Sequence, residues 1–377
     1  MDFSNDYLST KAKALVPYVA GLQPQEPGWI KLNTNENPYP PSPKVYEALQ
    51  NADISRLRLY SDGDSYALKE AIAKDVGLAP ENIFCGNGSD EVLALAFQAF
   101  FSGKSNVLTP DVSYGFYPVW GNMYDVGLVK KPLRDDFSLD PADYKNGNGV
   151  IIANPNAPSS LALGLSDVEQ ILHQNPKGVV LVDEAYIDFA RVESTVTLLG
   201  GPCNGVPDGQ CLSDNHVGYE NLLVVRTFSK SHSLAGMRVG YAIGPPKLIA
   251  ALGLVRDAFN SYPLDMLAQT AAIAAIKDRP YLAQTLSQVI ITRDTTAARL
   301  REMGYYVLPS HTNFILIQTP EAQGLYNYLL KNKILARYWA TPRLKDYLRV
   351  SIGTNKEMEA FLQCVQEFAS ERPTKQI

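Results

Sequence analysis

The middle of the chain alternates short apolar runs with amphipathic segments. Five runs are rich in Val, Ile and Leu and show little polar alternation, which is typical of strands in a parallel sheet covered on both faces. These predicted strands are residues 106–110, 149–155, 178–185, 222–230 and 238–244. Residues 90–101 and 165–174 carry apolar side chains at i, i+3 and i+4 and predict helices, the second with a capping box from Ser166 to Glu169. Strands alternating with helices predict an α/β fold.

A different pattern begins after residue 266. A long helical stretch is followed by short strand-like runs and a final amphipathic helix, which predicts a small α+β domain over residues 267–377. Residues 41–266 then form the large domain, and residues 1–40 form an N-terminal arm that packs with the small domain. A chain of 377 residues is long enough for this division, because single cores rarely grow beyond about 250–300 residues.

Composition excludes several classes of protein. The 34 basic and 39 acidic residues give a net charge of −5, whereas a nucleic-acid-binding protein needs a basic face. No apolar run approaches the length of about 18 residues that a membrane span requires, and the N-terminus has no signal-peptide core. We therefore expect a soluble, cytoplasmic protein without nucleic-acid or membrane partners.

The cysteines and one polar loop give little functional signal. The four cysteines, with no CxxC pair, predict reduced thiols; they are Cys85, Cys203, Cys211 and Cys364. Two of them share a Gly- and Pro-rich stretch, residues 200–220, with His216, but the spacing matches no common zinc pattern. We expect a surface loop there and no metal.

Polar side chains follow the predicted strands at their carboxyl ends, where parallel α/β sheets gather functional residues. The residues are Asn154 and Asn156, Asp183 and Tyr186, Ser229 and Lys230, and, beyond Asp111, the aromatic group Tyr114, Phe116 and Tyr117. Each position alone is a weak signal. Together they predict one pocket.

Three positions in this pocket have both a structural and a chemical interpretation. Asp183 ends a buried run and is either a structural ion-pair partner or the partner of a cationic ligand atom, such as a protonated pyridine nitrogen. Lys230 and Arg238 are either surface cations or a pair in which the arginine lowers the lysine pKa and binds a phosphate. The Gly-rich sequence FCGNGSDEVLAL at residues 84–95 is either a turn or a phosphate seat at a helix start.

Eight stretches, in order, resemble the histidinol-phosphate aminotransferase family of fold-type-I enzymes that use pyridoxal 5'-phosphate (PLP). They are LNTNENPYPPSP (32–43), YSDGDSYALKEAIA (60–73), GNGSDE (86–91), NPNAPSS (154–160), DEAYIDF (183–189), RTFSKSHSLAGMRVGYAIG (226–244), HTNFILI (311–317) and YLRVSIG (347–353). The resemblance implies a large domain with a mostly parallel sheet of the seven-stranded type, covered by helices, and a smaller α+β domain built from both chain ends.

The resemblance also implies residue roles. Lys230 would hold PLP covalently and move the substrate's α-proton, Asp183 would pair with the pyridinium nitrogen, and Tyr186 would bond the ring hydroxyl. The other cofactor contacts would come from Gly88, Ser89, Asp90, Tyr114, Asn156, Ser229, Arg238 and, across a homodimer interface, Tyr60. The substrate contacts would come from Tyr18, Asn35, Arg337 and Arg349.

Three departures from the family pattern limit this transfer. Ala157 stands where an asparagine is usual, so Asn156 or Asn154 is a candidate to replace its contact, or Tyr186 makes that contact alone. His232 lies near the phosphate-binding turn, where we expect a structural role. The loop at residues 200–220 is longer than in most relatives.

The resulting hypothesis is a PLP-dependent amino transfer from L-histidinol phosphate to 2-oxoglutarate, in histidine biosynthesis. Alternatives are an aromatic amino acid aminotransferase, a related phosphothreonine-type decarboxylase and a non-catalytic PLP-binding protein. A dinucleotide-dependent dehydrogenase is excluded because no GxGxxG turn joins a strand to a helix.

Overall fold

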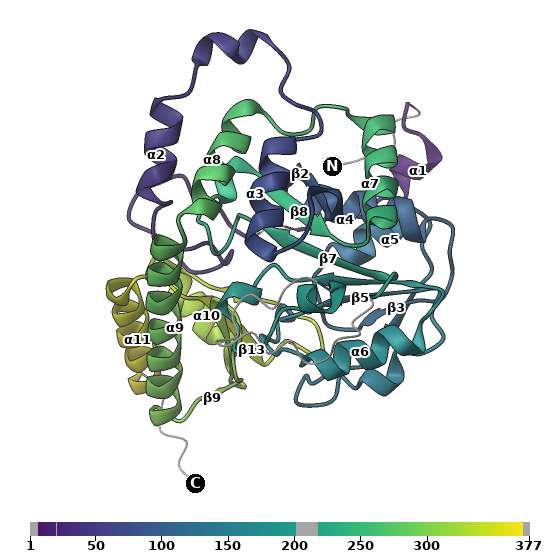
Figure 1. The fold of residues 1–377 in the computed structure, drawn as a ribbon. Coiled ribbons are helices and arrows are strands. Elements are labelled where there is room, and N and C mark those ends of the chain that lie inside the picture. Colours follow the sequence, from purple (N-terminus) through teal and green to yellow (C-terminus); the bar gives the residue numbers. More distant parts are fainter. Residues whose placement is uncertain (1–6, 20, 201–217, 372–377) are drawn as a thin grey trace, which may run out of the picture.

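The structure is a computed structural model that describes residues 7–19, 21–200 and 218–371. Figure 1 shows a large part built on one wide sheet, with a smaller part beside it that carries the C-terminal helices. This arrangement confirms the predicted α/β fold with a smaller α+β part. The predicted surface loop, with Cys203, Cys211 and His216, falls largely outside the described residues.

The large part contains a seven-stranded sheet in the order β2-β8-β7-β6-β5-β3-β4, in which β8 alone runs antiparallel to its neighbours. The strands are β2 (Ile83–Asn87), β3 (Val107–Pro110), β4 (Leu128–Lys131), β5 (Gly149–Ala153), β6 (Val179–Asp183), β7 (Leu222–Thr227) and β8 (Val239–Ile243). The five predicted strands are confirmed, and β2 and β4 are additional.

Helices cover both faces of this sheet, which explains why its strands lack polar alternation. Within β5, Val150 and Ile152 face a core shared with α3, α6 and α8, whereas Ile151 faces a core shared with α4, α5 and α7. The helices are α2 (Pro43–Gln50), α3 (Tyr66–Val76), α4 (Gly88–Ala96), α5 (Tyr117–Met123), α6 (Leu165–Gln174), α7 (Pro246–Phe259) and α8 (Met266–Lys277). The predicted helices are confirmed as α4, with its continuation to Phe101, and α6.

The predicted capping box of α6 is wrong. The helix begins at Leu165, two residues earlier than the pattern requires, and its N-cap is Gly164. The amide of Gly164 donates to Asp167 at 3.3 Å, so Asp167 performs the function predicted for Glu169. Ser166 lies inside the first turn and cannot act as the cap.

The smaller part is a four-stranded antiparallel sheet, β12-β13-β10-β9, packed against three helices. Its strands are β9 (Tyr306–Val307), β10 (Phe314–Gln318), β12 (Arg337–Tyr338) and β13 (Tyr347–Ser351), and its helices are α9 (Arg279–Glu302), α10 (Ala322–Lys331) and α11 (Asn355–Ser370). A separate pair joins β1 (Ile30–Lys31) to β11 (Ile334–Leu335), which attaches part of the N-terminal arm here. The short α1 (Thr10–Lys13) instead lies beside α5, where Lys11 pairs with Asp125.

The helix α8 packs in the core of the large part, with Ala271, Ala272 and Ile276 in the cluster that includes Leu68 and Ile72 of α3. The helix α9, in contrast, joins the core of the smaller part through Val289 and Leu300. We therefore propose that the small domain begins near Asp278, one helix later than the sequence boundary at residue 267.

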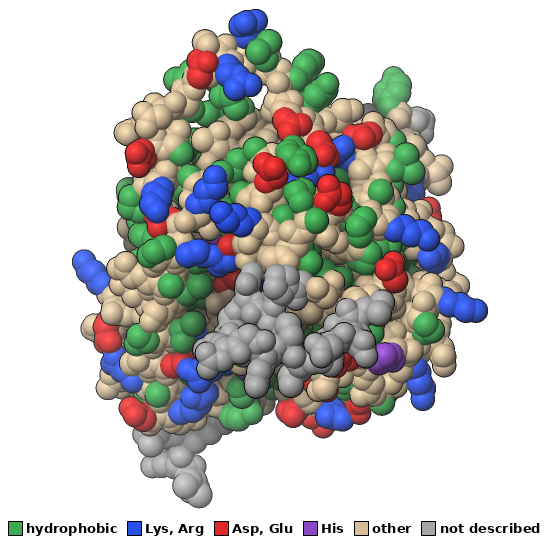
Figure 2. Space-filling model, viewed as in Figure 1, with side chains coloured by type: hydrophobic (Ala, Val, Ile, Leu, Met, Phe, Trp, Pro, Cys, Tyr) green, Lys and Arg blue, Asp and Glu red, His purple; other side chains and the backbone are tan. Residues whose placement is uncertain are grey.

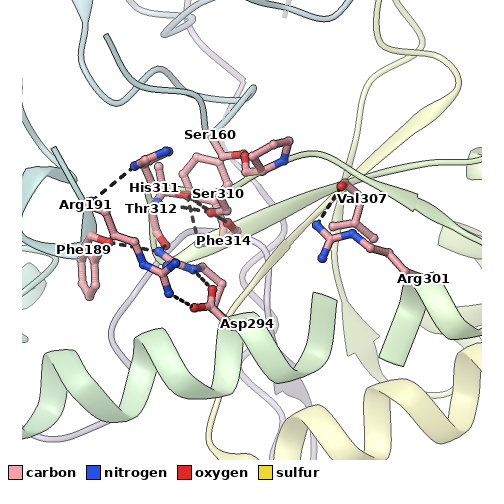
Figure 3. A network of polar contacts seen from close by, with 12 residues as sticks. Ser160, Phe189, Arg191, Asp294, Arg301, Val307, Ser310, His311, Thr312 and Phe314 are labelled. Atoms are coloured by element: carbon pink, nitrogen blue, oxygen red, sulfur yellow. Dashed lines mark hydrogen bonds and ion pairs between the residues drawn. The ribbon is translucent and has the colours of Figure 1, made fainter. Parts of the chain in front are cut away.

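The two parts meet at a polar network around the start of β10. Arg293 of α9 is 1% exposed and donates to the carbonyls of Phe189 and Thr312, each at 3.0 Å. Figure 3 shows Asp294 facing Arg191, which belongs to the large part. This network joins the segment after β6 to the loop before β10, so both segments have fixed positions near the cavity described next. Among the described residues, no helix is long and apolar enough to cross a membrane.

Candidate active site

A cavity of about 390 Å³ lies at the carboxyl ends of the large sheet, where the two parts meet. Twelve residues predicted for the site line it: Tyr18, Asn35, Ser89, Asp90, Tyr114, Asp183, Tyr186, Ser229, Lys230, Arg238, Arg337 and Arg349. The strands β6 and β7 end here, as the positions of Asp183 and Lys230 required. Residues from the N-terminal arm and from β12 and β13 complete the wall.

Lys230 follows β7 and projects into the cavity, where its Nζ donates to the carbonyl of Thr34 at 3.2 Å. Burial lowers the pKa of Lys230 to about 8, and the nearby Arg349 and Arg238 act in the same direction. Its backbone carbonyl accepts from Asn37 at 3.1 Å, which fixes the start of the side chain. A substantial neutral fraction near pH 8 makes this amine a competent nucleophile and base.

Asp183 is 5% exposed at the end of β6. Burial raises the pKa of Asp183 to about 6, although Tyr117 donates its hydroxyl to the carboxylate at 2.9 Å and the amide of Ala185 donates at 3.2 Å. Among the described residues no cation pairs with Asp183, so its charge lacks a counter-ion. A cationic ligand atom would supply one.

Tyr186 links the large part to the smaller part. Its hydroxyl accepts from Asn35 at 2.9 Å, and its ring contacts Phe314 edge-on at a centroid distance of 5.2 Å. Asn35 is in turn held by Ser351, which donates at 2.9 Å, and by Asn313, which donates to the Asn35 carbonyl at 2.9 Å. The tyrosine hydroxyl is therefore placed by three segments that lie far apart in the sequence.

The start of α4 and Arg238 form a compact seat for an anion. Gly88 has φ +78° and lies so close to Arg238 that a Cβ there would be 2.5 Å from a guanidinium nitrogen. Arg238 is 3.3 Å from Asp90 and 3.4 Å from the hydroxyl of Ser229. The free amides at a helix start and a guanidinium fork both bind phosphate well.

A second pair of cations lies on the smaller part. Arg337 and Arg349 face each other in the register of β12 and β13. Arg349 donates to the carbonyl of Asn33 at 2.8 Å, and Arg337 donates to the carbonyl of Val19 at 2.8 Å. The Nε of Arg349 is buried and has no hydrogen-bond partner among the residues that the structure describes, and burial lowers the pKa of this guanidinium. These features indicate a site for an anionic group of a ligand.

Comparison with known proteins identifies the family. Residues 27–365 match the family model described as aminotransferase class I and II. The chain is 45% identical to the histidinol-phosphate aminotransferase of Clostridium botulinum (strain Okra) over 364 residues, which covers 96% of this chain and 98% of the relative. The protein of the same name from Brachyspira hyodysenteriae is 45% identical over 363 residues, with the same coverage. The chain belongs to the histidinol-phosphate aminotransferase family.

A solved histidinol-phosphate aminotransferase shares the fold. The structure from Sinorhizobium meliloti, described as a complex with pyridoxal-5'-phosphate, superimposes with a TM-score of 0.80. It is 23% identical, and the match covers 98% of this chain and 99% of that one. The fold-type-I architecture predicted from the sequence is confirmed.

The candidate residues Gly88, Asn154 and Asn156 are not among those that line the cavity of this aminotransferase. Asn156 accepts from Ser113 at 2.8 Å and donates to the carbonyl of Val112 at 3.0 Å, so its amide is fully used within the fold. Asn154 is likewise bonded to Leu163 in both directions. Both amides are therefore held by bonds within the fold, and a cofactor contact by Asn156 stays a prediction. Ala157 itself lines the cavity.

Tyr60 also lies outside the cavity of this aminotransferase, because its side chain is 84% exposed and stacks on Tyr262 at 4.5 Å. A role for Tyr60 therefore requires a second subunit. His232 points its Nδ1 at Ser231, 3.0 Å away, and packs on Phe228. Burial lowers the pKa of His232 to about 4, so it is neutral and has a structural environment. Within the described ranges, no group of three or more His, Cys, Asp or Glu could hold a metal ion.

Sequence reasoning missed several residues that this aminotransferase places in the site. Thr34 and Glu36 line the cavity and flank Lys230 from the N-terminal arm. Tyr117 was grouped with Tyr114 by its position, but nothing in the sequence indicated its bond to Asp183. Trp339 lines the cavity beside Arg337. Trp339 stands two residues after Arg337, directly beyond the end of β12, and this spacing was the signal for a shared face.

Proposed function

We propose that this protein is a PLP-dependent enzyme that transfers the amino group of L-histidinol phosphate to 2-oxoglutarate. The observation that carries the proposal is the grouping, in one cavity, of a partly buried lysine of lowered pKa with two separate anion-binding groups. One group is the seat at Arg238 and the other is the pair Arg337 and Arg349. The sequence identity to enzymes of that name supports the substrate assignment.

The residues present fit PLP. Its pyridinium nitrogen would supply the counter-charge that Asp183 lacks, and its phosphate would suit the seat formed by Gly88, Ser89 and Arg238. A side chain at position 88 would fill that seat, because its Cβ would clash with Arg238. Lys230 would hold the cofactor covalently, Tyr186 would bond its ring hydroxyl, and the Tyr114 ring would lie against it.

The side chains then divide the reaction between them. When bound, the cofactor supplies an electron sink that stabilises negative charge at the substrate α-carbon. The neutral amine of Lys230 takes the α-proton and returns it, because its pKa of about 8 lies close to neutral operating conditions. The carboxylate of Asp183 keeps the ring nitrogen protonated. The buried walls around Tyr186 and Phe314 limit the access of water.

The pair Arg337 and Arg349 serves the anionic groups of both substrates. A guanidinium fork accepts a phosphate or a carboxylate in the same bidentate geometry. One pocket can therefore bind a phosphate monoester in the first half-reaction and a dicarboxylate in the second. The aromatic lining by Tyr18 and Tyr114 also suits one competing donor class, aromatic amino acids.

The decisive experiment is a single-turnover titration followed in the visible absorption of the lysine-bound cofactor. We expect the wild-type band to disappear on addition of L-histidinol phosphate, and the Lys230→Ala variant to lack that band. If L-phenylalanine removes the band and L-histidinol phosphate does not, the competing donor class is correct. If the wild-type protein shows no band after incubation with PLP, Lys230 does not have the proposed role.

We also propose a homodimer, with Tyr60 contributed across the interface. The segment between α2 and α3 projects from the top of the molecule in Figure 1, and Figure 2 shows hydrophobic side chains among charged ones there. The exposed fraction is 67% for Ile54, 52% for Leu59 and 84% for Tyr60, and nearby Phe259 of α7 is 77% exposed. Apolar surface of this kind marks an interface more often than free surface.

Mixing two inactive variants tests the shared site. A hybrid of Lys230→Ala and Tyr60→Phe subunits rebuilds one complete site only if Tyr60 acts on the other subunit. We expect partial recovery of activity when the variants are unfolded and refolded together. No recovery, alongside hybrid dimers seen by native mass spectrometry, would place Tyr60 elsewhere. The predicted cytoplasmic location stays a prediction.

A further inference from the structure

Arg337 and Arg349 share one aromatic face. The guanidinium carbon of Arg337 lies 5.4 Å from the ring centroid of Trp339, and that of Arg349 lies 5.3 Å from the same centroid. Both distances are within the range of about 6 Å over which a cation is attracted to an indole face. A single tryptophan therefore contacts both of the cations assigned to the substrate.

This arrangement addresses a problem of like charges. The two arginines are directly opposite in the β12–β13 register, and like charges in that position repel. Among the described residues neither forms an ion pair with a carboxylate, and their hydrogen bonds go to the carbonyls of Val19 and Asn33. Arg349 also lies 5.1 Å from the ring centroid of Phe314, but in the described part of the chain it is the indole of Trp339 that contacts both cations.

Trp339 also separates two hollows. It lines the 390 Å³ cavity of the candidate active site and a second, adjoining cavity of about 360 Å³. Tyr114 and Leu344 line both cavities as well and complete the dividing wall. The loop that follows Trp339 is attached to the large part, because Arg343 donates to Asp111 and to the carbonyl of Leu133, each at 3.1 Å. The residues between the two cavities are therefore attached both to the smaller part and to the large part of the molecule.

We propose that Trp339 is a specificity-determining residue, which positions both guanidiniums for an anionic substrate group and closes the pocket against bulky aromatic donors. This inference rests on the proposed function, because it names the feature by which the same site prefers phosphate- and carboxylate-bearing substrates. The second cavity is the space that an aromatic side chain would occupy once the indole is removed.

The first test compares Trp339→Phe with Trp339→Leu in the holoenzyme. Phenylalanine keeps a π face, whereas leucine fills similar space without one. We expect Trp339→Leu to raise the KM for L-histidinol phosphate and for 2-oxoglutarate by about threefold to tenfold, from the loss of one or two cation–π contacts, with little change in kcat. Trp339→Phe should recover most of this loss.

A matched control lies next to Trp339. Tyr338 points to the opposite face of the strand and stacks on Tyr326 at 5.8 Å. Tyr338→Leu removes an aromatic ring from the neighbouring position and leaves the indole beside both arginines, so its KM values should stay close to those of the wild type. Equal KM increases in Tyr338→Leu and Trp339→Leu would overturn the proposal, because the effect would then be general loosening of β12.

The second test does not require turnover. The difference between the emission spectra of the wild type and Trp339→Phe isolates the fluorescence of Trp339. We expect inorganic phosphate and succinate each to change this signal, since an anion between the guanidiniums alters their contact with the indole. No change with either anion, at concentrations that inhibit the enzyme competitively, would overturn the positioning role.

The third test concerns the wall. Trp339→Ala joins the two cavities, so the ratio of kcat/KM for L-phenylalanine to that for L-histidinol phosphate should rise at least about tenfold. An unchanged ratio would overturn the specificity role. If the wild type has no activity with L-histidinol phosphate but the anion-induced fluorescence change is present, the proposed function fails while the positioning role of Trp339 stands.

Discussion

Replacing Asp183 by asparagine should stabilise the cofactor-free protein at neutral pH and weaken cofactor binding. Burial raises the pKa of Asp183 to about 6, whereas an aspartate in an unfolded chain titrates near about 3.9. The folded protein therefore binds a proton more tightly at this site than the unfolded chain does. Asparagine has nearly the same shape, can still accept from Tyr117, and carries no charge to bury.

The size of the effect follows from the two pKa values. A group with a raised pKa contributes stability that is present below about pH 4 and is lost as the pH rises through about 6. At about pH 5 the wild type has lost about 1.5 kcal/mol from this group, and at about pH 7.5 it has lost about 3 kcal/mol. The free energy of unfolding of Asp183→Asn, relative to wild type, should therefore rise by about 1 to 1.5 kcal/mol over that interval.

Urea unfolding of the cofactor-free proteins at these two pH values measures the difference. Asp136→Asn is the matched control: bonds from the hydroxyl and amide of Ser138 lower the pKa of exposed Asp136, so it is ionised throughout the interval. Its effect on stability should not change between the two pH values. A constant difference for Asp183→Asn as well would refute the reasoning that burial of this carboxylate is costly.

Addition of PLP should favour the wild type over Asp183→Asn in the free energy of unfolding. The ionised Asp183 then gains a counter-charge, so the wild type should be stabilised more than Asp183→Asn at the same PLP concentration. Equal stabilisation of both proteins would show that Asp183 does not face the cofactor nitrogen.

Three further predictions concern other parts of the molecule. Lys230→Arg keeps the positive charge but removes the titrating amine, so kcat should fall by about 10²–10⁴-fold in a steady-state assay, while circular dichroism shows an unchanged fold; a loss below tenfold would contradict its role as the base. Arg293→Met leaves the carbonyls of Phe189 and Thr312 without donors, so the free energy of unfolding should fall by about 2–4 kcal/mol in urea, and a loss within 0.5 kcal/mol, as is typical of surface sites, would contradict this. Burial raises the pKa of Cys85 to about 12, so mass spectrometry should find it alkylated only after unfolding; rapid labelling of the native protein at about pH 8 would contradict its burial.

The strands that the sequence failed to predict have physical reasons for their weak signal. The strand β2 contains Gly86 and is followed by Gly88, and these glycines suggest a turn, although the first four residues of β2 are buried. The strand β4 is at the edge of the sheet and contains Lys130 and Lys131, which are typical of edge strands because charges discourage further pairing. Apolar runs identify the central strands of a sheet well, but they do not identify strands that contain glycine or edge strands that contain lysine.

In the candidate site, too, residues with a local signal in the sequence differ from contacts that only the fold creates. Asp183, Lys230 and Arg238 could be predicted because each stands beside a buried strand or a turn in the local sequence. The bond from Tyr117 to Asp183 and the contact of Lys230 with Thr34 could not be predicted, because they join segments that only the folded sheet brings together. The bond from the amide of Asn156 to the carbonyl of Val112 is of the same kind, and the predicted cofactor contact of Asn156 stays a prediction.

The N-terminal residues 33–37 explain why the site needs both parts of the molecule. Thr34 accepts from Lys230, and Asn35 donates to Tyr186, both of which belong to the large part. The same Asn35 is held by Ser351 of β13, and the carbonyl of Asn33 accepts from Arg349. A shift of the smaller part would therefore displace Arg349 together with the groups that bond Lys230 and Tyr186. If Arg349 binds the substrate anion, as we propose, this coupling transmits that binding to the position of the lysine amine.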